Sequence, residues 1–180
     1  MLYFVTGGER SGKTRFATAL AQFLSDGRDK PLYIATARPW DDDFRERIAK
    51  HIQARGSDWE NVEQEKQISR VIPARRVVVI DCVTLWLTNY FSDNNGDMSR
   101  SLAEASTELE SLFKQNATLI IISNEIGMGG HADTELGRKF TELHGWVNQQ
   151  IAARADTVVF LVSGIPVTIK GKLPEELSVG

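Results

Sequence analysis

Short apolar segments rich in β-branched residues alternate along the chain with longer segments of helical period. This alternation is typical of a mostly parallel sheet flanked by helices, the α/β class. Several apolar runs are continuous, which indicates strands buried on both faces. Strands are expected at residues 2–6, 32–36, 77–81, 118–123, 157–162 and 167–170.

The segments between these runs predict the helices and one tight turn. Only Ser163, Gly164, Ile165 and Pro166 separate the last two strands, so we expect an antiparallel C-terminal edge strand, where a proline is tolerated. Residues 171–180 read as a tail without core residues. Helices are expected at residues 12–24, 42–55, 63–72, 85–91, 99–114 and 134–155.

Length and composition limit the class of protein. The 180 residues indicate a single domain, which we place at residues 1–170, and 42% hydrophobic with 25% charged residues is typical of a globular protein. A net charge of −3 argues against nucleic acid as the main partner. No apolar run approaches the roughly 20 residues of a membrane span. Since the lone Cys82 cannot form an internal disulfide, a cytoplasmic protein is expected.

The strongest chemical signal lies between the first strand and the first helix. The sequence there fits G-x-x-x-x-G-K-[ST], whose glycines let backbone amides face an anion while the following helix adds its positive end. Lys13 would reach the β- and γ-phosphates of a nucleotide, and the Thr14 hydroxyl would bind Mg²⁺. The alternative is a glycine turn that merely joins strand and helix. The loop residues are Gly7, Gly8, Glu9, Arg10, Ser11, Gly12, Lys13 and Thr14.

Asp81 ends the third expected strand, as does the Walker B carboxylate that completes a Mg²⁺ shell. Thr14, Asp81 and phosphate oxygens are the only metal ligands that we predict. The alternative for Asp81 is a cap on the next helix. Since no guanine-reading Asn-Lys-x-Asp follows a later strand, a regulatory GTPase is disfavoured, and the loop by itself favours a small P-loop kinase.

The expected helix at residues 42–55 has two faces of different chemistry. Apolar residues recur every four positions on one face, whereas Arg47, His51 and Arg55 recur at the same spacing on another. Flanking guanidinium groups would disfavour the imidazolium form and keep His51 available as a nucleophile. From this pattern alone, a surface histidine on a charged helix is the other interpretation.

Taken together, the motifs resemble the bifunctional adenosylcobinamide kinase / adenosylcobinamide-phosphate guanylyltransferase family of cobalamin biosynthesis. The likeness runs in order and spacing from about residue 2 to residue 170. It departs at residues 130–135, which follow Gly129. The segments that carry it are the phosphate loop, Tyr33-Ile34-Ala35-Thr36-Ala37, Arg47 with His51 and Arg55, Trp59 with Glu63, residues 81–89, residues 123–129, residues 138–149 and Ser163-Gly164-Ile165-Pro166.

The resemblance implies two reactions. ATP or GTP would phosphorylate the aminopropanol hydroxyl of adenosylcobinamide, and His51 would take GMP from GTP and pass it to adenosylcobinamide phosphate, giving adenosylcobinamide-GDP. The resemblance also implies a homotrimer. Besides the phosphate loop, the positions that match GTP-binding residues of the family are Ala35, Thr36, Ala37, Ile52, Gln53, Ala54, Arg55, Glu63 and Asp81.

Other residues invite a functional and a structural interpretation. Glu125 follows an expected strand end and is our candidate base for the substrate hydroxyl, the alternative being a carboxylate bonded to the adjacent glycine loop. Helical spacing favours core or subunit packing for the aromatic residues after Asp81 over a corrin-stacking surface. His131 and His144 read as ordinary polar residues. These aromatic residues are Trp86, Tyr90 and Phe91.

Two other functions remain open on the sequence. One is a P-loop small-molecule kinase without nucleotidyl transfer, in which His51 is a surface residue. The other is a nucleotide-binding module without chemistry of its own. Retention of label from α-labelled GTP distinguishes the guanylyltransferase from both.

Overall fold

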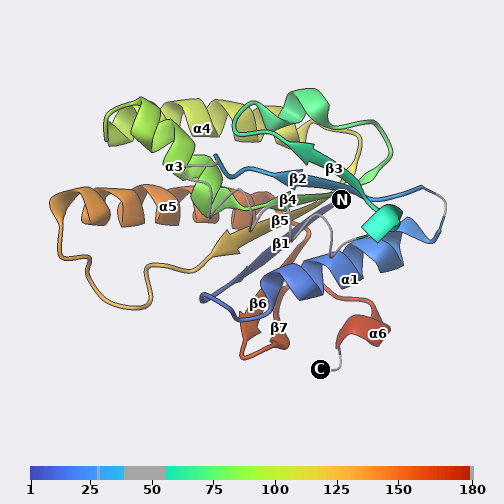
Figure 1. The fold of residues 1–180 in the computed structure, drawn as a ribbon. Helices are drawn as coiled ribbons and strands as arrows, with labels where there is room; N and C mark the ends of the chain where they lie inside the picture. Colours follow the sequence, from blue (N-terminus) through green and yellow to red (C-terminus); the bar gives the residue numbers. More distant parts are fainter. Residues whose placement is uncertain (28, 39–55, 179–180) are drawn as a thin grey trace.

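The computed structural model describes residues 1–27, 29–38 and 56–178, whose strands form one seven-stranded sheet (Figure 1). The strand order is β3-β2-β4-β5-β1-β6-β7. All neighbouring pairs are parallel except β6 with β7, which form the expected antiparallel hairpin. The strands are β1 (Leu2–Gly7), β2 (Leu32–Ala35), β3 (Glu60–Glu63), β4 (Val77–Asp81), β5 (Thr118–Asn124), β6 (Thr157–Val162) and β7 (Ile165–Lys170).

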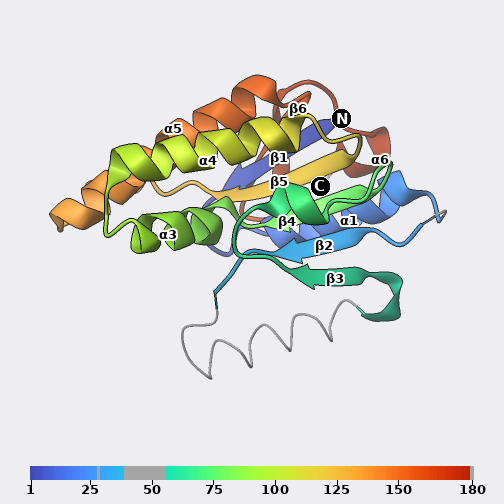
Figure 2. The same cartoon turned by 90° about the horizontal axis from the view of Figure 1, so that it is seen from above.

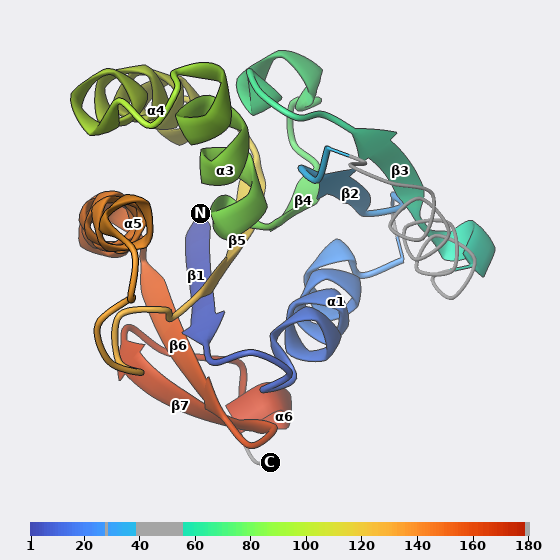
Figure 3. The same ribbon diagram turned by 60° about the vertical axis from the view of Figure 1, so that its left-hand side comes forward.

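Helices cover both faces of the sheet, as Figures 2 and 3 show. Alternate side chains of β1 separate the core into two clusters: Leu2 and Phe4 pack with α3, α4 and α5, whereas Tyr3 and Val5 pack with α1. Burial on both faces is the physical reason for the continuous apolar runs. The helices are α1 (Lys13–Ser25), α3 (Val83–Asp93), α4 (Met98–Phe113), α5 (Glu135–Arg154) and the short α6 (Glu175–Ser178).

The expected strands are confirmed to within two residues, as are four of the expected helices, those at α1, α3, α4 and α5. Two of them start at a residue whose side chain caps the helix. The Asp97 carboxylate accepts from the Arg100 amide before α4, and the Thr134 hydroxyl accepts from the Gly137 amide before α5. The expected helix at residues 42–55 lies outside the described residues.

The helix expected at residues 63–72 is wrong. Its first residue ends β3, and a single 3₁₀ turn, η2 (Ile68–Val71), follows, while another, η1 (Gly56–Asp58), precedes β3. Gln67 has a left-handed φ of 51°, which interrupts a helix at that point. Ile68, with 1% of its surface exposed, is buried in the core at the start of this 3₁₀ turn, where no α-helix forms.

The C-terminal residues also differ from expectation. Leu173 and Leu177 pack against the α1-side core cluster, so the segment after β7 is not a tail without core residues. A long apolar helix of the kind that crosses a membrane is not found in the described part of the chain.

Candidate active site

The phosphate loop connects the carboxyl end of β1 to the first turn of α1. Gly12 occupies the N-cap with φ 95°, a left-handed conformation that favours glycine, and provides no side chain to cap the helix. Gly7 is equally constrained, because an added Cβ would lie 2.6 Å from the carbonyl oxygen of Leu161. Helix α1 therefore begins at the loop without a side-chain cap, and the amides of its positive N-terminal end are the kind of group that binds an anion.

The turn between β6 and β7 packs against the phosphate loop. The Gly164 amide donates to the Ser11 carbonyl at 2.9 Å, and a Cβ on Gly12 would lie 3.3 Å from the Gly164 Cα. Gly164 itself has φ 88°. This contact gives the Ser163-Gly164 motif a physical role, which is to let the hairpin approach the loop closely.

Lys13, Thr14 and Asp81 lie together at the carboxyl edge of the sheet. The Thr14 hydroxyl donates to Asp81 Oδ2 at 3.3 Å, and the Tyr33 hydroxyl donates to the same oxygen. Lys13, buried to 8% exposure, donates from Nζ to the Gly8 carbonyl at 2.6 Å. Burial lowers the pKa of Lys13, with Cys82, Asp81 and Glu9 acting in the opposite direction. The arrangement combines the cation and oxygen donors that a nucleotide–metal complex requires.

The oxygen pair fits a magnesium ion. Thr14 Oγ1 and Asp81 Oδ2 are 3.3 Å apart. Neighbouring ligands of an octahedral Mg²⁺ at about 2.1 Å stand about 3 Å from each other, and the remaining positions are normally filled by water and phosphate oxygens. Within residues 1–27, 29–38 and 56–178, no group of three His, Cys, Asp or Glu side chains forms an all-protein metal site.

Four further predicted nucleotide-binding residues lie at, or directly after, the ends of neighbouring strands. Ala35 at the end of β2 is in register with Glu63 of β3 and with Asp81 of β4. The Thr36 hydroxyl donates to the Cys82 carbonyl and accepts from the Cys82 amide, so its side chain fixes the local backbone. Ala37 is buried, with 8% of its surface exposed.

Glu125 is placed close to the phosphate loop by the backbone. Its amide donates to the Gly7 carbonyl at 2.9 Å, while its carboxylate Oε1 accepts from the Gly127 amide at 3.0 Å. The second contact is the one that the structural interpretation of this carboxylate predicts. A role of Glu125 as a base stays a prediction.

The aromatic residues after Asp81 belong to the core. Trp86, Tyr90 and Phe91 are 1%, 5% and 7% exposed, which confirms packing as their role. His51, with the nucleotide-binding positions Ile52, Gln53, Ala54 and Arg55, lies outside the described residues.

A buried polar network connects α3 and α5 to the end of β5. It was not predicted from the sequence. His144 Nε2 is 2.9 Å from the Thr84 hydroxyl, which accepts from the Asn124 side-chain amide at 3.2 Å. Asn148 accepts from the Ser123 hydroxyl at 2.7 Å. Burial lowers the pKa of His144 to about 4, so the imidazole is neutral at pH 7. Its place on the buried stripe of α5 is the sequence signal that could have revealed it.

A glycine-rich loop that joins β1 to α1, with Lys13 and a Thr14–Asp81 oxygen pair at the carboxyl edge of a parallel sheet, defines a P-loop nucleotide-binding protein. The family model described as cobinamide kinase / cobinamide phosphate guanyltransferase, CobU, matches residues 3–169. The chain belongs to this family.

Curated relatives agree with this assignment over nearly their whole length. The chain is 38% identical to the bifunctional adenosylcobalamin biosynthesis protein CobU of Escherichia coli K12, with 94% of this chain and 100% of the relative covered. It is 36% identical to the bifunctional adenosylcobalamin biosynthesis protein CobP of Pseudomonas aeruginosa, with 93% of this chain and 96% of the relative covered. CobU of Salmonella typhimurium is 34% identical, covering 94% and 100%.

Proposed function

We propose that this chain is a bifunctional enzyme of cobalamin biosynthesis, which phosphorylates adenosylcobinamide and then transfers GMP to the phosphorylated product. One observation carries the proposal. In a chain of this family, Lys13 lies at the phosphate loop together with Thr14 Oγ1 and Asp81 Oδ2, and these two oxygens are 3.3 Å apart. Residues matched to a nucleotide site by sequence alone thus meet at one edge of the sheet.

In the kinase step, the hydroxyl oxygen of adenosylcobinamide attacks the γ-phosphorus of ATP or GTP, and the bond from that phosphorus to the bridging oxygen breaks. The loop amides and Lys13 bind the phosphates and stabilise the charge that develops on them. Thr14, Asp81 and phosphate oxygens would hold Mg²⁺, which would neutralise part of the phosphate charge. The carboxylate of Glu125, a residue whose backbone amide donates to the Gly7 carbonyl, accepts the hydroxyl proton. The loop itself does not select between ATP and GTP, because it binds phosphates and not the base.

In the guanylyl transfer, a nitrogen of the His51 imidazole attacks the α-phosphorus of GTP and pyrophosphate leaves. GMP is then carried on a phosphorus–nitrogen bond. A phosphate oxygen of adenosylcobinamide phosphate attacks the same phosphorus, the bond to nitrogen breaks, and adenosylcobinamide-GDP forms. We place the predicted residues Ala35, Thr36, Ala37, Ile52, Gln53, Ala54, Arg55 and Glu63 in the binding of GTP for this step.

The proposal includes a homotrimer that works in the cytoplasm. The likeness to the family supports the trimer, and the buried free Cys82 suits a reducing compartment. Size-exclusion chromatography with light scattering measures the oligomeric state. A mass of three chains is expected, and a mass of one chain contradicts this part of the proposal.

The deciding experiment is incubation with α-labelled GTP and Mg²⁺. Label that is retained on the protein, labile in acid and stable in base, is expected for a phosphoramidate. His51→Ala should abolish the label while leaving the kinase activity measurable, whereas Lys13→Ala should reduce both. Wild-type protein that phosphorylates adenosylcobinamide without retaining label would instead be a P-loop kinase without nucleotidyl transfer. Nucleotide binding without either reaction would leave only a binding module.

A further inference from the structure

The last residue of β5 lies between the two parts of the candidate active site. β5 is the neighbour of both β1, which leads into the phosphate loop, and β4, which ends at Asp81. Asp81 is in register with Ile122, whereas Gly7 is in register with Asn124. β5 therefore continues two residues beyond the end of β4, and Asn124 stands at the sheet edge between the loop and the metal-binding carboxylate.

Asn124 belongs to the face of the sheet that carries the phosphate loop. Successive side chains of a strand leave it on opposite faces. Ile122 packs in the core cluster of α1, whereas the next residue, Ser123, contacts His144 of α5 on the other face. Asn124 follows Ser123 in the same strand, so its Cβ is on the face of α1, the helix that begins in the phosphate loop.

Thr84 fixes the orientation of the Asn124 carboxamide. Thr84 Oγ1 accepts from the main-chain amide of Asn124 at 3.4 Å and from its side-chain Nδ2 at 3.2 Å, so it provides an acceptor where β4 has ended. The same hydroxyl lies 2.9 Å from Nε2 of the buried His144. One side-chain N–H is thereby directed to Thr84, and the second has no hydrogen-bond partner in the described part of the chain.

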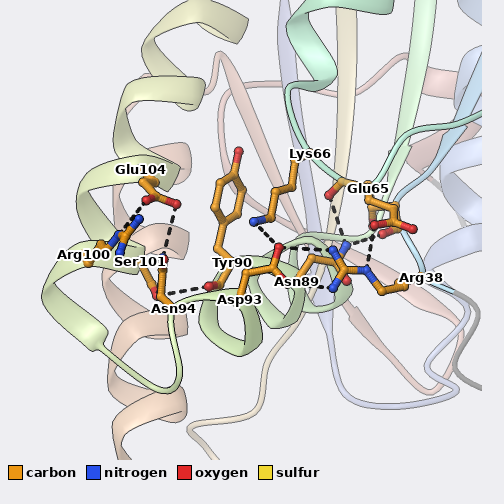
Figure 4. Close-up of polar contacts among 11 residues, drawn as sticks. Arg38, Glu65, Lys66, Asn89, Tyr90, Asp93, Asn94, Arg100, Ser101 and Glu104 are labelled. Atoms are coloured by element: carbon orange, nitrogen blue, oxygen red, sulfur yellow. Dashed lines mark hydrogen bonds and ion pairs between the residues drawn. The ribbon is translucent and has the colours of Figure 1, made fainter.

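The helix that presents Thr84 is itself held at two further points. Asn89, 1% exposed, donates from its side-chain amide to the Glu65 carbonyl at 3.1 Å. At the end of α3, Asp93 accepts from both Nη atoms of Arg38, at 2.8 and 3.2 Å (Figure 4). α3 is therefore fixed at its middle and at its end, which keeps Thr84 in place at its start.

We propose that Asn124 binds the terminal phosphate of the nucleoside triphosphate, by donating its second side-chain N–H to a non-bridging phosphate oxygen. Lys13 and the Thr14–Asp81 oxygen pair mark the end of the site where the β- and γ-phosphates belong, and Asn124 stands at that end. Hydrogen bonds to an anionic oxygen are stronger than neutral ones. Thr84 is a positioning residue, because it acts through Asn124. The proposal rests on the nucleotide site of the proposed function, in which this phosphate is transferred.

The contact should distinguish a triphosphate from a diphosphate. A hydrogen bond to a charged group contributes a factor of about ten to about a hundred in affinity, and we expect the lower value because Asn124 is partly exposed. Asn124→Ala should therefore weaken binding of β,γ-imido-ATP with Mg²⁺ about tenfold and binding of ADP with Mg²⁺ less than about twofold. Asn124→Asp should weaken β,γ-imido-ATP further, because it places a negative charge beside the phosphate.

The test is equilibrium titration of both nucleotides against wild type, Asn124→Ala, Thr84→Val and the double variant. Thr84→Val releases the carboxamide and should also weaken β,γ-imido-ATP more than ADP. Because Thr84 acts through Asn124, the double variant should lose no more than Asn124→Ala alone. Thr88→Val is the matched control, since its hydroxyl donates to the Thr84 carbonyl at 2.8 Å on the same helix. This control should keep the wild-type affinity for both nucleotides.

Each outcome is decisive. Wild-type affinity of Asn124→Ala for β,γ-imido-ATP overturns the inference. Equal losses for β,γ-imido-ATP and ADP also overturn it, because they indicate a structural role of Asn124 in the loop, and the urea unfolding midpoint registers any general loss of stability. Phosphorylation of adenosylcobinamide by the wild-type protein tests the proposed function separately. If that reaction is absent, the proposed function fails, whereas a selective loss in Asn124→Ala would still support the phosphate contact.

Discussion

Acid should destabilise this protein through one buried histidine. His144 is 1% exposed and contacts Thr84, Ser123 and Asn148, with the ring of Phe140 beside it. Burial lowers its pKa from 6.5 to about 4. The imidazole is therefore neutral in the folded protein at pH values where it is already protonated in the unfolded chain.

The sign and size of the effect follow from linkage. Because the unfolded state binds the proton first, the free energy of unfolding falls as the pH drops below 6.5, and the loss is complete below about pH 4. The full shift of the pKa from 6.5 to about 4 corresponds to a loss of about 3 kcal/mol in the free energy of unfolding. Between pH 7.5 and pH 5, before most carboxylates titrate, the loss should be about 2 kcal/mol.

Urea unfolding, followed by circular dichroism between pH 7.5 and pH 5, measures this quantity. With a typical denaturant slope of about 2 kcal/mol/M, the midpoint should fall by about 1 M. His144→Gln removes the titrating group and should flatten the dependence, whatever its stability at pH 7.5. His131→Gln, at an exposed position, should keep the wild-type dependence. If His144→Gln loses as much stability as wild type between these pH values, the assignment of the acid sensitivity to His144 is wrong.

Three further predictions concern the loop, the metal pair and the core. Gly12→Ala should weaken nucleotide binding by about tenfold or more in equilibrium titration, because the residue has φ 95° and its Cβ would lie 3.3 Å from Gly164. Unchanged affinity would show that the loop tolerates the side chain. Asp81→Asn should weaken nucleotide binding about tenfold with Mg²⁺ but less than about twofold with EDTA, because it removes the charge of a carboxylate that would bind the metal. Equal losses in both conditions would contradict the metal role of Asp81. Leu20→Ala, at a position 0% exposed, should lower the free energy of unfolding by about 2–5 kcal/mol, whereas Phe23→Ala, at a position 44% exposed, should cost less than about 1.5 kcal/mol in the same urea titration; similar losses would contradict the packing of α1.

Local signals were sufficient for much of the fold. Continuous apolar runs predict β4, β5 and β6 because each strand is buried on both faces. Lys13 and Thr14 could be placed at the site because the glycines of the motif specify the backbone of the loop that positions both residues. Asp81 could be placed beside them because parallel strands end at one edge. These predictions needed no knowledge of a distant partner.

The features that were missed depend on partners far along the chain. β3, with the sequence Glu60-Asn61-Val62-Glu63, has no apolar run and forms a strand because it pairs with β2. The Arg38–Asp93 pair spans 55 residues, and neither side chain is distinctive in its local sequence. A charged residue before residues 39–55 and another at a helix end become informative only when the fold brings them together.

Helix α3 connects several parts of the candidate site to the core of the protein. α3 begins at Val83, two residues after Asp81, and ends at Asp93, a length of about 16 Å. Its first turn reaches the His144 network through Thr84, its middle holds the Thr36 backbone through Asn89, and its end holds Arg38. With Trp86 and Leu87 buried in the core, at 1% and 0% exposure, the helix is fixed to the sheet. One buried helix therefore connects the strand end that carries Asp81 with the backbone at Thr36 and the side chain of Arg38, so a shift of α3 would disturb the Asp81 end of the candidate site.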